Sequence, residues 1–64
     1  MIINGENVAL TAPQTLAELL AARGCRAEQV AVERNGAIVK QADFAAVELT
    51  DADKLEIVSF VGGG

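Results

Sequence analysis

The sequence predicts an α+β fold in which one main helix packs on one face of a mixed sheet of four or five strands. Three features predict it: two Asn-Gly dipeptides within β-rich segments, one amphipathic helix with recognisable ends, and a final β-rich segment. Of the 64 residues, 52% are apolar, and Val, Ile, Leu, Phe and Met supply 20 side chains for an interior. Such an interior suits one sheet on one helix and leaves no material for a separate catalytic cleft.

The chain is expected to open with a β-hairpin. Met1–Ile3 is a short apolar run, and Asn4-Gly5 is a dipeptide that favours a tight two-residue turn. Over residues 7–12, Val8, Leu10 and Ala12 then occupy every second position, which predicts a half-buried return strand. Pro13 closes that strand, because proline has no amide hydrogen for a strand ladder.

The main helix is predicted next, over the segment that starts at Thr15. Thr15 and Glu18 have the spacing of a capping box, with Thr15 as the N-cap. Gly24 stands where a left-handed C-terminal cap ends a helix. The leucines of this segment share one face at helical spacing, namely Leu16, Leu19 and Leu20.

A second hairpin is expected in the middle of the chain. The β-rich segments 30–34 and 37–39 flank Asn35-Gly36, another tight-turn dipeptide. Residues 41–46 then contain Phe44 among small and polar residues, which indicates a short helical turn anchored by one aromatic ring.

A turn over residues 50–53 leads into the longest predicted strand, residues 54–61. The order is therefore two strands, a helix, two strands and a last strand. The simplest packing lays the helix across one face of a mixed sheet, as in an α+β roll of the β-grasp kind. We expect this domain to comprise residues 1–61, followed by a flexible glycine tail over residues 62–64.

The last strand offers a candidate docking surface. Leu55 and Ile57 alternate with Val58 and Phe60, so the two pairs point to opposite faces of the sheet. If the helix covers the first pair, Val58 and Phe60 are exposed. Ile2, on the first strand, is the third residue expected at this surface, where exposed apolar side chains would anchor a partner protein.

The terminal glycines, Gly62, Gly63 and Gly64, cannot serve stability, because glycine loses the most backbone entropy on ordering. A stretch without Cβ atoms can enter a channel too narrow for side chains. Extended from Val61, it reaches roughly 13 Å. The sequence thus predicts a thread that carries the terminal carboxylate into a partner's active site.

Composition excludes several functions. Nine acidic and five basic residues give a net charge of −4, which opposes binding to nucleic acid. Without histidine, no zinc set and no histidine-based nucleophile pair can form, so no metal site is expected. Cys25 has no second cysteine as a disulfide partner and is expected to be a thiol without a role. With no apolar run of membrane-spanning length, we expect a soluble cytoplasmic protein.

The chain also resembles a known family, in segments that run through most of its length: residues 4–6, 15–20, 30–32, 35–39, 53–58 and 60–64. In their order and spacing, in a short chain ending in glycines, these segments are similar to the ubiquitin-like proteins. The resemblance is greatest to the ThiS family, the bacterial sulfur carriers of thiamine biosynthesis.

The resemblance implies a mechanism. An E1-like adenylating enzyme would join the Gly64 carboxylate to the α-phosphate of ATP, and sulfur from a persulfide, supplied by a cysteine desulfurase, would displace AMP. The resulting thiocarboxylate would donate sulfur to thiazole synthase. The chain would then be a protein co-substrate and not an enzyme, monomeric alone, with ATP bound by the partner and no cofactor of its own.

Two alternatives stay open at this point. The small subunit of molybdopterin synthase has the same fold and tail, although its chains usually run longer. A small protein-interaction module with an incidental glycine tail belongs to a different class, and it would tolerate deletion of Gly64.

Overall fold

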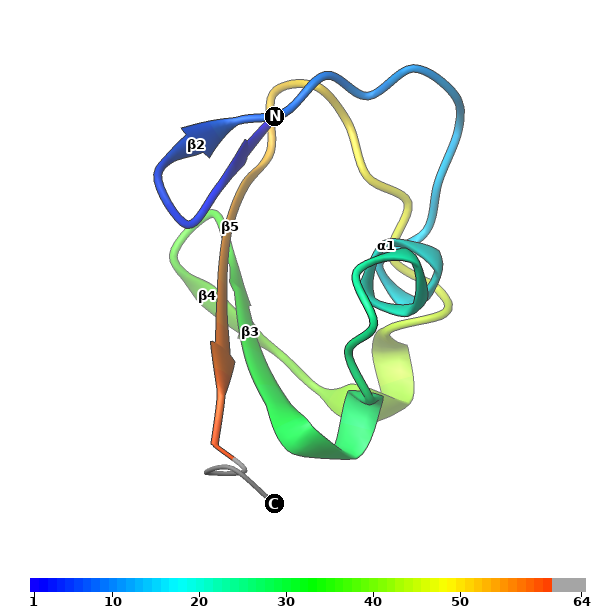
Figure 1. The fold of residues 1–64 in the computed structure, drawn as a ribbon, viewed down its shortest axis with the longest axis vertical. Coiled ribbons are helices and arrows are strands. Elements are labelled where there is room, and N and C mark those ends of the chain that lie inside the picture. The colour runs from blue at the N-terminus through cyan, green and yellow to red at the C-terminus, as the bar shows by residue number, and fades with distance from the viewer. Residues whose placement is uncertain (61–64) are drawn as a thin grey trace.

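The computed structural model describes residues 1–60, and it has the predicted α+β architecture (Figure 1). Val61 and the predicted tail, residues 62–64, lie outside the described residues. Along the chain, the elements are β1 (Ile2–Ile3), β2 (Glu6–Asn7), α1 (Leu16–Ala22), η1 (Ala27–Gln29), β3 (Val30–Arg34), β4 (Ala37–Val39), η2 (Gln41–Asp43) and β5 (Lys54–Ser59). The two η elements are single turns of 3-10 helix.

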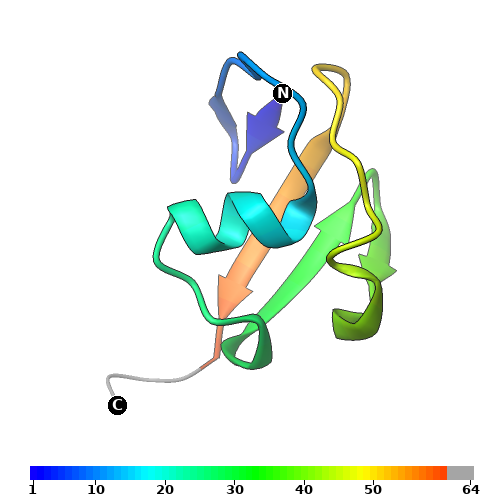
Figure 2. The same ribbon diagram turned by 90° about the vertical axis from the view of Figure 1, so that its right-hand side faces the viewer.

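The five strands form one mixed sheet in the order β2-β1-β5-β3-β4. β5 lies at its centre, parallel to β1 and antiparallel to β3. The helix α1 crosses one face of this sheet (Figure 2). The segment between β4 and β5 runs beside this helix, on the same side of the sheet. The chain therefore has the β-grasp fold that the element order predicts.

Both predicted hairpin turns are confirmed. Asn4 and Gly5 have φ of 51° and 84°, and Asn35 and Gly36 have φ of 53° and 86°. Two consecutive residues in the left-handed region are typical of the tight turn whose twist matches that of antiparallel strands. Local sequence alone therefore fixes how β1 meets β2 and how β3 meets β4.

The predicted return strand over residues 7–12 is wrong in extent, because β2 ends at Asn7. Ile2 pairs with Asn7, and the Val8 amide donates to the Met1 carbonyl at 2.8 Å. No residue of β1 lies opposite residues 9–12, so their alternating pattern has no ladder to join. The Leu10 amide donates instead to the Asp51 carboxylate at 3.1 Å.

The helix ends are confirmed in detail. The Thr15 hydroxyl accepts the Glu18 amide at 3.1 Å, and the Glu18 carboxylate accepts the Thr15 amide at 2.8 Å, which is a complete capping box. At the other end Gly24 has φ of 73°. Its amide and that of Cys25 donate back into the last turn, as in a Schellman cap.

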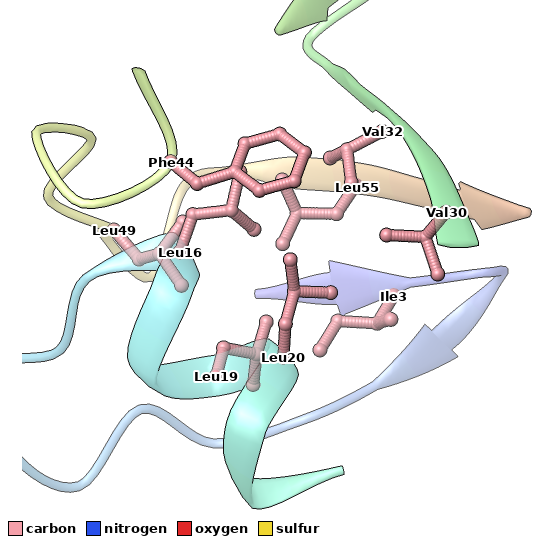
Figure 3. Packing of buried hydrophobic residues seen from close by; sticks show 9 residues of the cluster. All are labelled: Ile3, Leu16, Leu19, Leu20, Val30, Val32, Phe44, Leu49 and Leu55. Carbon is pink, nitrogen blue, oxygen red and sulfur yellow. The ribbon is translucent and has the colours of Figure 1, made fainter. Parts of the chain in front are cut away.

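One apolar cluster joins the helix to the sheet (Figure 3). The helix contributes its three leucines, as the spacing predicted. Phe44 is only 4% exposed and anchors the turn η2 against this cluster, which confirms its expected role. The other members come from the sheet and the segment before β5, namely Ile3, Val30, Val32, Leu49 and Leu55.

Candidate functional site

The outer face of β5, opposite the helix, exposes apolar side chains just before the chain leaves the sheet. Leu55 is buried and Ile57 half-buried on the inner face, whereas Val58 is 59% and Phe60 61% exposed. The expected exposure of Val58 and Phe60 is confirmed. The Phe60 amide donates to the Gln29 carbonyl at 3.1 Å, so the backbone at this point is still held by the turn η1 that leads into β3.

Ile38 on β4 is a further member of this surface, and the sequence reasoning missed it. Its side chain is 69% exposed. Ile38 pairs with Glu33, and Val58 pairs with Ala31 two residues earlier on the same face of β3. Ile38 and Val58 therefore lie diagonally across β3. We call Ile38, Val58 and Phe60 the outer-face patch.

The Asn35-Gly36 turn was the signal that could have found Ile38. A two-residue turn fixes which residues of a hairpin face each other, and here it places Ile38 opposite Glu33. Because Glu33 alternates with the buried Val32, Ile38 must share the exposed face.

Ile2 does not join the outer-face patch. It is 37% exposed, as expected, but it pairs with Lys54, at the far end of β5 from Phe60. Lys54 and Val58 are four positions apart along β5, which is roughly 13 Å. The expectation that Ile2 extends the surface around Val58 is therefore not met in this register, and a docking role for Ile2 stays a prediction.

Negative charge lies beside the outer-face patch. Glu33 and Glu56 are directly opposite each other on β3 and β5, and both are exposed. Like charges that face each other across a ladder destabilise a sheet slightly. The same arrangement favours a partner surface that brings basic side chains next to an apolar socket.

At the other end of β5, a buried carboxylate fixes where the strand begins. Asp53 is 4% exposed and accepts hydrogen bonds from the Thr50 amide at 2.8 Å and the Asn35 side chain at 3.0 Å. The Arg34 guanidinium lies 3.2 Å away. Burial raises the pKa of Asp53, but these hydrogen bonds and the Arg34 charge outweigh it and hold that pKa below its ordinary value.

Cys25 and the terminal glycines are the remaining positions that the sequence analysis considered. Cys25 is half-buried at the helix exit, with its Sγ 3.9 Å from the Arg23 carbonyl oxygen. Gly62, Gly63 and Gly64 lie outside the described residues.

Within residues 1–60, no three His, Cys, Asp or Glu side chains gather in a way that could hold a metal ion. None of the helices described there has the length and apolar character needed to cross a membrane.

Comparison with known proteins identifies the family. The model of the ThiS family matches residues 1–64. The chain belongs to the ThiS family. A crystal structure of the thiamine biosynthesis protein ThiS from Geobacter metallireducens superimposes with a TM-score of 0.80 at 33% identity, covering 98% of this chain and 96% of that one.

Curated relatives of two kinds are similar to this ThiS-family chain. The sulfur carrier protein ThiS of Bacillus subtilis (strain 168) is 46% identical over 50 residues, which are 78% of this chain and 76% of that protein. A thiazole synthase of Paramagnetospirillum magneticum is 47% identical over 64 residues, which are 100% of this chain and 20% of that protein. The chain thus spans about a fifth of the length of the thiazole synthases it matches.

Proposed function

We propose that this chain is a sulfur carrier in thiamine biosynthesis, and that the carboxylate of Gly64 is the group that carries the sulfur. The observation that carries the proposal is the family match, which extends through the glycines to residue 64. The similar proteins described above are named as the sulfur carrier ThiS, as a thiamine biosynthesis protein and as a thiazole synthase, which supports the thiamine pathway over the molybdopterin alternative.

The chemistry follows from the weakness of a carboxylate as an electrophile. An E1-like enzyme activates it: the Gly64 carboxylate attacks the α-phosphate of ATP, pyrophosphate leaves, and an acyl-adenylate forms. The terminal sulfur of a persulfide, made by a cysteine desulfurase, then attacks the acyl carbon and expels AMP. A second thiol cleaves the S–S bond of the acyl disulfide, forms a new disulfide and releases the thiocarboxylate, which is the nucleophile for thiazole synthase.

In this scheme the chain provides a docking surface and the C-terminal carboxylate, and the partner provides catalysis. The outer-face patch adjoins the end of β5. A partner that binds this patch is therefore positioned next to the point from which the chain continues toward Gly64. Glu33 and Glu56 suit a partner with basic residues around its socket. ATP is bound by that partner, and this chain acts as co-substrate without a cofactor of its own.

Intact mass measurement tests the proposed function. The chain is incubated with an E1-like adenylating enzyme, ATP, a persulfide donor and a thiol, and we expect a mass shift equal to the replacement of one oxygen by sulfur at Gly64. An AMP adduct without sulfur would support activation and implicate the donor. No change with any adenylating enzyme tried would instead favour an interaction module.

Phe60→Ala tests the outer-face patch. We expect it to weaken binding to the adenylating enzyme by about 2 kcal/mol, since a central aromatic anchor is lost, while the unfolding free energy changes by less than about 1 kcal/mol. Titration calorimetry and thermal unfolding measure the two quantities. Ile2→Ala is the matched control on the same face, with a smaller expected effect on binding. Equal losses of binding and stability for Phe60→Ala would identify a core residue.

Cys25→Ser tests whether this thiol takes part in sulfur transfer. Within residues 1–60 its Sγ has one polar contact, the Arg23 carbonyl at the helix end, and a half-buried cysteine behaves as a small apolar side chain. We expect the rate of thiocarboxylate formation, followed by mass, to stay within about twofold of wild type. Failure of the serine variant to accept sulfur would indicate a covalent relay through Cys25.

A further inference from the structure

Within the part of the chain that the structure describes, the second half of β5, which leads to Phe60 and is called its exit half below, has a neighbouring strand on only one side. β3 pairs with β5 from Leu55 to the end of the strand, where Val30 is opposite Ser59. On the other side, β1 reaches only Lys54 and Leu55 before its turn begins (Figure 1). Among residues 1–60, therefore, no strand pairs with the Val58 part of β5 on the β1 side.

The Asn4 side chain takes the place of the missing strand residue. The Asn4 backbone amide donates to the Leu55 carbonyl at 2.9 Å. In the side chain, Oδ1 accepts the Ile57 amide at 2.7 Å, and Nδ2 donates to the Ile57 carbonyl at 3.1 Å. A carboxamide both donates and accepts, so it pairs with both polar groups of Ile57 as a backbone peptide would.

Asn35, at the same position of the other hairpin turn, binds the opposite end of β5. Its Oδ1 accepts the Lys54 amide at 2.9 Å, and its Nδ2 donates to the Asp53 carboxylate at 3.0 Å. The φ values of the two asparagines are nearly equal, at 51° and 53°. Each turn thus directs one amide onto β5, Asn35 at the start of the strand and Asn4 on the half that leads to the tail.

We propose that Asn4 is a positioning residue for partner docking: by clamping Ile57, it holds the outer-face residues Val58 and Phe60 in place for the adenylating enzyme. The inference rests on the proposed function. Without the clamp, the exit half of β5 keeps its pairing with β3 and the packing of Ile57 on the core but loses its hydrogen bonds on the β1 side, so partner binding must also order this edge of the strand. The loss should appear in the affinity for the partner and not in the chemistry after binding.

Asn4→Gly and Asn35→Gly form a matched pair of variants. Glycine adopts the positive φ of each turn without strain, and each substitution removes two side-chain hydrogen bonds. In the free protein, we expect Asn4→Gly to speed hydrogen exchange of the Ile57 amide roughly tenfold and Asn35→Gly to leave it unchanged. Asn4→Asp is a second variant that keeps the acceptor for the Ile57 amide and loses the donor.

The functional measurement is ATP–pyrophosphate exchange by an adenylating enzyme that loads the wild-type chain, at a temperature where all variants are folded. We expect Asn4→Gly to raise the KM for the carrier about five- to tenfold with kcat unchanged, Asn4→Asp to raise it less, and Asn35→Gly to leave it near the wild-type value. Faster exchange at Ile57 with an unchanged KM would overturn the positioning role, and so would equal KM values for the two glycine variants. If no adenylating enzyme tried shows exchange with the wild-type carrier, the proposed function is overturned instead, and the positioning role with it.

Discussion

Adding one residue after Gly64 is expected to abolish adenylation of the carrier. The extension moves the carboxylate away from the α-phosphate of ATP and puts an amide in its place, which cannot attack phosphorus. We expect the acyl-adenylate and the thiocarboxylate both to fall below detection by intact mass. The unfolding free energy should change by less than about 0.5 kcal/mol, because the added residue lies beyond the core.

A cleavable extension supplies the control for this prediction. A protease site placed directly after Gly64 blocks the carboxylate until cleavage restores the terminus, and loading must return with cleavage. A Phe60→Ala variant should respond differently to excess adenylating enzyme. The excess should restore loading of a carrier that docks weakly, but it cannot restore loading of a carrier whose terminus is blocked. Full loading of the extended chain would contradict a reactive Gly64 and direct attention to a side chain.

The parts of the fold that could be predicted from sequence are those fixed by neighbouring residues. Asn-Gly dipeptides favour left-handed backbone at both turn positions, and both hairpin turns form as expected. The capping box needs only Thr15 and Glu18, three residues apart, and Gly24 ends the helix by its own conformational freedom. The alternation along β5 likewise predicted which of its side chains are exposed.

What could not be predicted depends on the register between distant segments. The pattern over residues 7–12 suits a strand, but a strand also needs a partner, and β1 does not extend that far. The sequence predicts Ile2 as an exposed apolar residue of the first strand near Val58, whereas the β1–β5 register places it beside Lys54. The clamp between Asn4 and Ile57 joins residues 53 positions apart, so a turn dipeptide gives no sign of it.

Asp53→Ala is expected to be the most destabilising substitution of a polar side chain discussed above. It leaves the Arg34 guanidinium without its carboxylate and removes the acceptor for the Thr50 amide and the Asn35 side chain. Removing one partner of a largely buried pair costs about 3 kcal/mol. A chain of this size has roughly 3–10 kcal/mol of stability in total, so the variant should be marginally folded. Urea unfolding measures the loss, with exposed Asp43→Ala as control.

The same carboxylate makes stability depend on pH, with a sign set by its lowered pKa. Because the pKa of Asp53 is lower in the folded chain than in the unfolded chain, its stabilisation is complete above the unfolded value of about 3.9 and is lost as pH falls through the folded value. The unfolding temperature should therefore decrease from about pH 4 downward. Asp53→Asn has no such titration, so its unfolding temperature should be lower at neutral pH and fall less steeply in acid. Parallel curves for the two proteins would mean that other carboxylates cause the acid sensitivity, and that Asp53 fixes the start of β5 by hydrogen bonding alone.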